Sequence, residues 1–164
     1  YIPMLRKSIL IIFTVIIPGL LLLTACSEDT GSPEQQIRQL LADMESAVQQ
    51  RSLDQVKPLV SADYNDQWNG SRSAALRSLM FYFQGHQSIH LLTRVSEIEL
   101  AENQQQARVV VYVGMAGNPV DNAQQLLAIN ADVYRFEIDL VADGKEWLVS
   151  QARWQRARLE DFGL

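Results

Sequence analysis

The chain has 164 residues, of which 48% are hydrophobic and 20% are charged, a composition that can bury one core and requires no second domain. Its formal net charge of −5, with no Lys/Arg cluster ahead of the C-terminus, excludes nucleic acid as an expected partner. No repeat period marks a solenoid or a propeller.

The first 25 residues have the order of an export signal. A short basic region (Arg6, Lys7) precedes an apolar run over residues 9–23, and small residues stand directly before Cys26. An uncleaved transmembrane helix is the alternative, because the run lies near the lower limit of about 17 to 25 residues needed to cross a bilayer. The Pro18-Gly19 pair inside the run favours cleavage.

Residues 23–26 (Leu-Thr-Ala-Cys) resemble the lipobox of bacterial lipoproteins. The resemblance implies that the Cys26 thiol carries a lipid, with acyl chains such as palmitate, and that the chain is cleaved before it. We therefore expect a signal peptide at 1–25, a lipidated cysteine and tether at 26–33, and one domain at 34–164. Ser27, in place of Asp, implies the periplasmic face of the outer membrane. Because Cys26 is the only cysteine, its lipidation leaves no thiol for a disulfide, a metal or nucleophilic catalysis.

Three helices are expected in the first half of the domain. Ser32 caps the first, with Pro33 at its first position and Gln35 as the capping-box partner. A short helix over residues 53–60 follows Ser52, and a third helix starts at Ser71 or Ser73 and ends at Gly85. The first helix has one apolar stripe at three- and four-residue spacing: Ile37, Leu40, Leu41, Met44 and Val48.

After Gly85 the apolar period changes from 3.6 to 2, which predicts an antiparallel meander. The first strand, 89–100, changes parity near Ser96, where we expect a bulge. The second, 107–115, is apolar on both faces and should be central. The remaining expected segments are a loop over 114–122, a long strand over 126–141, an Asp143-Gly144 hairpin, a last strand over 147–154 and an additional short strand near 64–68.

Helices followed by strands predict an α+β domain, with the N-terminal helices packed on a strongly bent antiparallel sheet. Three segments, 59–64 (Leu-Val-Ser-Ala-Asp-Tyr), 70–72 (Gly-Ser-Arg) and 143–149 (Asp-Gly-Lys-Glu-Trp-Leu-Val), resemble the cone-shaped NTF2-like (cystatin-like) superfamily. The resemblance implies a cavity between the long helix and the concave face of the sheet. The superfamily includes ketosteroid isomerases, SnoaL-type cyclases and exported proteins without enzymatic activity, so its fold selects no single function.

Candidate site residues are sought around that cavity. Asp132 and Tyr134 share one face of the long strand, and a carboxylate at the rim of an apolar pocket is a candidate general base. Asp63 and Tyr64 are the second candidate pair, although both also suit a turn. The residues predicted to line a ligand site are Tyr64, Trp68, Tyr82, His86, Asp132 and Tyr134.

The remaining polar groups carry no predicted chemistry. His86 and His90 lack a third ligand, so that we expect no metal, and no motif indicates a cofactor. Arg153, Arg156 and Arg158 are interpreted as a solvated tail, because Glu160 and Asp161 dilute their charge.

Two functions compete for this sequence. The first is a membrane-anchored cell-envelope lipoprotein whose domain binds a small apolar ligand or a protein partner without catalysis, because no nucleophile–base pair or phosphate loop is visible. The alternative is an isomerase- or cyclase-like enzyme, with Asp132 or Asp63 as the base and Tyr64, Tyr82 or Tyr134 as the hydrogen-bond donor. A structural spacer is a third option. We also expect a homodimer through an apolar outer face of the sheet formed by Val109, Val111, Val113, Ala131 and Val133.

Overall fold

The computed structural model of the chain describes residues 31–129 and 131–162. The predicted signal peptide and Cys26 lie outside the described residues. Within them, no helix is long and apolar enough to cross a membrane. In chain order the elements are α1 (Pro33–Gln49), α2 (Leu53–Val56), the 3₁₀ turn η1 (Lys57–Leu59), α3 (Arg72–Gly85), β1 (His90–Leu100), β2 (Gln106–Ala116), α4 (Ala123–Ala128), β3 (Asp132–Asp143), β4 (Glu146–Arg156) and the 3₁₀ turn η2 (Leu159–Phe162).

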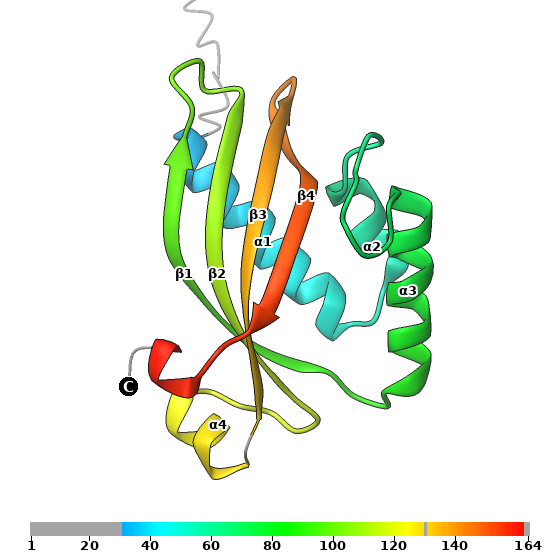
Figure 1. Ribbon diagram of the computed structural model, residues 1–164, viewed down its shortest axis with the longest axis vertical. Coiled ribbons are helices and arrows are strands. Elements are labelled where there is room, and N and C mark those ends of the chain that lie inside the picture. Colours follow the sequence, from blue (N-terminus) through cyan, green and yellow to red (C-terminus); the bar gives the residue numbers. More distant parts are fainter. Residues whose placement is uncertain (1–30, 130, 163–164) are drawn as a thin grey trace, which may run out of the picture.

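Four long strands form one antiparallel sheet in the order β1-β2-β3-β4, so that each strand pairs with the next along the chain (Figure 1). The predicted α+β class and the central position of β2 are confirmed. The pairing of β1 with β2 shifts register between Val95 and Glu97, which places a bulge at Ser96 as predicted. Gly144, with φ +63°, lies in the predicted tight turn between β3 and β4, and glycine adopts this left-handed conformation without strain.

The helix starts follow from local capping. The Ser32 hydroxyl accepts a hydrogen bond from the Gln35 N–H (3.3 Å), and the Gln35 carboxamide accepts one from the Ser32 N–H (2.8 Å), which completes the predicted capping box of α1. Ser52 and Ser71 cap α2 and α3 in the same way. The short helix predicted over 53–60 is divided between α2 and η1, because Pro58 has no N–H with which to continue the α-helical pattern.

Helix α1 packs across one face of the sheet, which we term the inner face (Figure 1). Ile37 and Leu40 of α1 are buried there in one core with Val109 and Leu140 of the sheet. Two side chains of α1 also bind the edge strand β1. The Glu45 carboxylate accepts a hydrogen bond from the Thr93 hydroxyl (2.5 Å), and Gln49 Oε1 accepts one from the Leu91 N–H (3.2 Å). These contacts hold the helix diagonally over the sheet.

Val109, Val111 and Val113 lie on this inner face, and each is at most 9% exposed. The prediction that they form an apolar outer face is therefore wrong. Strand parity groups the three valines correctly, but β2 is apolar in both parities, so parity cannot tell which set meets the helices. The homodimer stays a prediction, without the apolar surface that these valines were expected to provide.

A second, smaller core lies on the outer face, where α4 and η2 cover the end of the sheet (Figure 1). Its buried residues are Leu126, Val133 and Phe162. The strand predicted over 126–141 is wrong in its first part, because α4 occupies 123–128 and β3 begins only at Asp132. The Asn122 side chain accepts a hydrogen bond from the Gln125 N–H (3.0 Å) and starts the helix as an N-cap. The loop predicted over 114–122 is shorter than expected, because β2 extends to Ala116.

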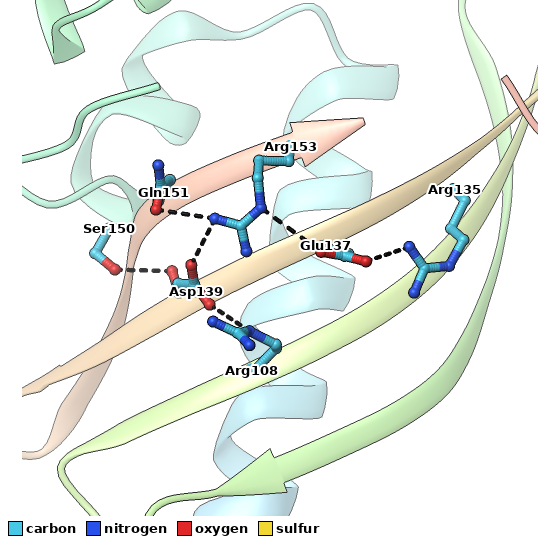
Figure 2. A network of polar contacts seen from close by, with 7 residues as sticks. All are labelled: Arg108, Arg135, Glu137, Asp139, Ser150, Gln151 and Arg153. Carbon is cyan, nitrogen blue, oxygen red and sulfur yellow. Dashed lines mark hydrogen bonds and ion pairs between the residues drawn. The ribbon is translucent and has the colours of Figure 1, made fainter. Parts of the chain in front are cut away.

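The middle of the outer face is charged. Arg108 binds Asp139 (2.9 Å), Asp139 binds Arg153 (3.1 Å), and Arg153 reaches Glu137 (3.6 Å), which also pairs with Arg135 (Figure 2). These pairs join β2, β3 and β4 across the strands. Hydrogen bonding to Arg135 is the main cause that lowers the pKa of Glu137, with a further contribution from Arg153. Arg153, predicted to belong to a solvated tail, is thus part of a network on the sheet.

Residues 60–65 line the free edge of β4. Val60 forms an isolated parallel bridge with Val149, the Ser61 N–H donates to the Val149 carbonyl (2.9 Å), and the Asn65 N–H donates to the Ser150 carbonyl (3.2 Å). The short strand predicted near 64–68 is absent, because residues 64–66 are irregular and a turn occupies residues 67–69.

Candidate functional site

Four aromatic side chains form a continuous series of ring contacts, which we term the aromatic row. The Trp68 ring lies 6.4 Å from that of Trp154, Trp154 stacks on Phe136 at 5.9 Å, and Phe136 lies 6.5 Å from Tyr134. Trp68 is 66% exposed, whereas the other three rings are half-buried. The aromatic row is therefore partly open to solvent, although Phe136 also packs against the main core.

The sheet register places this row on the inner face. Trp154 of β4 is directly opposite Phe136 of β3, and Phe136 is opposite Val111 of β2, a residue of the main core. The row thus continues the buried inner face toward the end of the sheet where β3 begins and β4 ends (Figure 1). Trp68 reaches it from the turn that precedes α3.

The last turn of α3 approaches the same end of the sheet. The Tyr82 hydroxyl donates a hydrogen bond to Met115 Sδ (3.8 Å), and Met115 is the cross-strand partner of Asp132. His86 stacks on Tyr82 with 4.1 Å between ring centres, and its Nδ1 lies 2.7 Å from the Tyr82 carbonyl oxygen. Burial, with smaller effects of Tyr134 and Asp132, raises the pKa of Tyr82, so the phenol keeps its proton at neutral pH. Four predicted site residues (Tyr82, His86, Asp132 and Tyr134) are therefore gathered near one end of the inner face.

Asp132 stands at the rim of this group. Its carboxylate forms an ion pair with Arg156 at 3.0 Å, and both side chains are largely exposed, at 54% and 75% respectively. Arg156 lies directly opposite Tyr134 in the β3–β4 register. The rim thus carries one carboxylate and one guanidinium beside the aromatic row, and the sequence had suggested only the carboxylate.

Tyr64 has a different environment from the other predicted residues. It is buried, and its hydroxyl donates a hydrogen bond to Asp66 Oδ2 at 2.7 Å. Burial and this contact with the carboxylate raise the pKa of Tyr64 strongly. Asp63, the other member of the predicted pair, is exposed in the preceding turn. The phenol of Tyr64 is therefore committed to its neighbour Asp66.

Asp66 is the buried carboxylate that sequence reasoning missed as a key residue. It is 3% exposed and accepts hydrogen bonds from Tyr64, the Trp68 N–H (2.7 Å), the Asn69 N–H (2.5 Å) and the Asn69 carboxamide (3.0 Å). Burial alone would raise the pKa of Asp66, but the hydrogen bonds from Asn69, Tyr64 and Trp68 together lower it. Because the Asp66 carboxylate accepts all these hydrogen bonds, it holds the turn that carries Trp68 in one conformation. The sequence pattern Asp66-x-x-Asn69-Gly70, which is typical of a turn, could have indicated this role of Asp66.

Two depressions in the described part of the surface lie away from the aromatic row. One, of about 330 Å³, is lined by polar side chains of the two hairpin ends and by the first turn of α1. The other, of about 340 Å³, lies between the end of α1, α2 and α3 and is lined by Leu53, Met80 and Phe83 among others. Among the described residues, no group of three or more His, Asp or Glu side chains is arranged to hold a metal ion.

No family model matches the sequence, and no curated protein matches it. Solved structures do share its fold. A domain from Thiobacillus denitrificans, provisionally assigned as a calcium/calmodulin-dependent protein kinase II association domain, is 8% identical with a TM-score of 0.61, over 74% of this chain and 94% of that one. A provisionally assigned dehydratase of the NTF2-like family from Streptomyces avermitilis is 10% identical with a TM-score of 0.59, over 77% and 97%. A Nostoc punctiforme domain of unknown function with a cystatin-like fold is 15% identical with a TM-score of 0.59, over 79% and 85%. At these identities the likeness establishes the NTF2-like fold of this chain and leaves its chemistry open.

Proposed function

We propose that the chain is a lipid-anchored protein of the cell envelope whose NTF2-like domain binds a small apolar ligand on the aromatic row, without catalysis. The observation that carries this proposal is the row itself. The rings of Tyr134, Phe136 and Trp154 are half-buried on the inner face, and they lie in series with the Trp68 ring, which is 66% exposed. Flat apolar ligands gain both surface burial and favourable ring stacking on such a surface.

The anchoring half of the proposal rests on the Leu-Thr-Ala-Cys box at residues 23–26. Cys26 stands seven residues before the first residue of α1, and an extended segment of that length spans about 24 Å. A lipid on Cys26 would therefore keep the domain close to the membrane surface. We place this anchor on the periplasmic face of the outer membrane because Ser27 follows the cysteine.

Replacing Cys26 is expected to release the protein from the membrane. Two or three acyl chains hold a protein on a bilayer far more firmly than one chain does, and Cys26→Ser removes their attachment point. The measurement is incorporation of labelled palmitate together with membrane fractionation, with Ser27→Ala as the matched control. A Cys26→Ser chain that remains equally membrane-bound would instead favour an uncleaved transmembrane helix at 9–23.

Removing Trp154, one of the two inner rings of the row, is expected to weaken ligand binding. A neutral benzophenone probe should label the peptides that contain Tyr134, Trp154 and the end of α3 on illumination. Trp154→Ala should lower this labelling about tenfold, because stacking on one aromatic ring is worth roughly 1–3 kcal/mol. Phe81→Ala removes an exposed ring of α3 outside the row (59% exposed) and should leave the labelling unchanged. Equal labelling of wild type and Trp154→Ala would remove the row as the site.

An isomerase- or cyclase-like activity is the second candidate, because Asp132 lies near the phenols of Tyr82 and Tyr134. Two of the structural neighbours carry provisional dehydratase assignments, which is compatible with such chemistry on this fold. Binding is preferred here, since Asp132 is more than half exposed and is already paired with Arg156. A general base acts best where water is excluded around it. Turnover that Asp132→Asn abolishes while leaving ligand binding intact would establish the enzyme instead.

A further inference from the structure

The groups at the rim of the aromatic row give information on the charge of the ligand. Asp132, Tyr134 and Phe136 alternate along the inner face of β3, and Arg156 and Trp154 alternate opposite them on β4. Tyr82 approaches from α3 through its hydrogen bond to Met115, which is the register partner of Asp132. The Asp132 carboxylate therefore stands near two phenol rings, Tyr82 on α3 and Tyr134 on β3, and opposite Met115 at the adjacent end of β2.

This environment favours a positively charged group on the ligand. The faces of tyrosine and tryptophan rings carry negative electrostatic potential and attract ammonium and guanidinium ions. A carboxylate next to such rings also attracts a cation, so the two effects add. An anion placed there would be repelled by Asp132 and by the ring faces, and only Arg156 would attract it.

The protein already places a cation at this position. The guanidinium of Arg156 lies 3.0 Å from the Asp132 carboxylate and projects from the residue directly opposite Tyr134. Because Arg156 is 75% exposed and Asp132 is 54% exposed, the pair contributes little stability and can separate at small cost. A ligand cation can therefore take the place of Arg156, while the arginine side chain turns to water.

We propose that the ligand of the aromatic row carries an ammonium or quaternary ammonium group, which replaces Arg156 as the counter-ion of Asp132 while the apolar body lies on Phe136 and Trp154. This inference rests on the proposed function, since it names the ligand class of the same site. Asp132 is then a specificity-determining residue, and Arg156 is an internal competitor for it.

The test uses three benzophenone probes that differ only in one substituent, which is trimethylammonium, tert-butyl or carboxylate. Each is photolysed with the mature lipidated protein in a neutral glycoside detergent, and the labelling of the peptides that contain Tyr134 and Trp154 is quantified by mass spectrometry. The trimethylammonium probe should reach half-maximal labelling at about tenfold lower concentration than the isosteric tert-butyl probe, and the carboxylate probe should label least.

Three variants separate the roles of the rim residues. Asp132→Asn should abolish the preference for the cationic probe and keep labelling by the neutral one. Arg156→Gln should improve labelling by the cationic probe several-fold, because it removes the internal competitor. Arg158→Gln is the matched control: Arg158 is 78% exposed, pairs with Glu160 and should change nothing.

The outcomes distinguish this inference from the proposed function. Equal labelling by the cationic and neutral probes, or a preference that survives in Asp132→Asn, would overturn the inference and leave the proposed binding site standing. Stronger labelling by the carboxylate probe would overturn it as well and assign Arg156 as the recognising group. Failure of all three probes to label the row would overturn both.

Discussion

Gly114→Val should destabilise the domain by about 3 kcal/mol, because the smaller core has no room for a side chain at this position. A Cβ on Gly114 would lie 2.4 Å from Leu126 Cδ1 and 2.9 Å from Leu126 Cδ2. Leu126 is fully buried and cannot move aside into solvent. The strand end must then separate from α4. The measurement is the free energy of unfolding from urea titration, followed by circular dichroism.

Two further variants show whether this contact is the cause. Gly117→Ala is the matched control, since nothing lies within 4 Å of a Cβ built there, and it should change stability by less than about 0.5 kcal/mol. In a double-mutant cycle of Gly114→Ala with Leu126→Ala, the double variant should lose less stability than the sum of the two single variants. Strict additivity would mean that the two residues do not press on each other.

Asp66→Ala should cost about 3 kcal/mol of stability, because it leaves the Tyr64 hydroxyl and the donors of Trp68 and Asn69 without their acceptor. The same change should release the turn that carries Trp68, so photolabelling of the aromatic row should also fall. Asp63→Ala is the control, since this exposed aspartate lies in the preceding turn and should alter stability by less than about 0.5 kcal/mol.

The Asp66 contribution should depend on pH in a defined direction. Its pKa in the folded protein is lowered, so the unfolded chain binds the proton more readily. The stabilisation is complete well above the ordinary aspartate pKa of about 3.9 and is lost as the pH falls through the lower folded pKa. The difference in unfolding free energy between wild type and Asp66→Asn should therefore narrow below about pH 4. A difference that grows on acidification would contradict this assignment.

The features that could be predicted from the sequence depend on short-range signals. A capping box such as Ser32 with Gln35 and a parity change at Ser96 are decided by residues a few positions apart. The same holds for the Asp143-Gly144 turn, where the chain must reverse within two residues. The order of these elements was then enough to indicate the α+β meander.

The wrong predictions concern choices made by distant contacts. Apolar residues in both parities of β2 left the inner and outer faces undecided, and the packing of Ile37 and Leu40 selects the set that contains Val109. Residues 126–128 are apolar enough to extend a strand, yet they belong to helix α4, in which Leu126 is buried against Gly114. Local propensity alone predicts neither of these two long-range contacts.

The sequence predicted several residues that the structure places in the candidate site, but it predicted their arrangement less well. Strand parity joined Asp132 to Tyr134, but only the β3–β4 register shows that Arg156 stands opposite Tyr134. Trp154 was not among the residues predicted to line a ligand site, whereas its ring lies in the aromatic row. Cross-strand register depends on the bulge between Asp139 and Leu140, and the sequence alone does not specify it.

The most direct test of ligand binding on the aromatic row is native mass spectrometry of the mature lipidated protein, extracted with mild detergent from the envelope of its own cell. Wild type should carry an additional small-molecule mass, Phe81→Ala should retain it and Trp154→Ala should lose most of it. A wild-type protein without bound mass, or a mass that Trp154→Ala keeps in full, would mean that the aromatic row is not a ligand site.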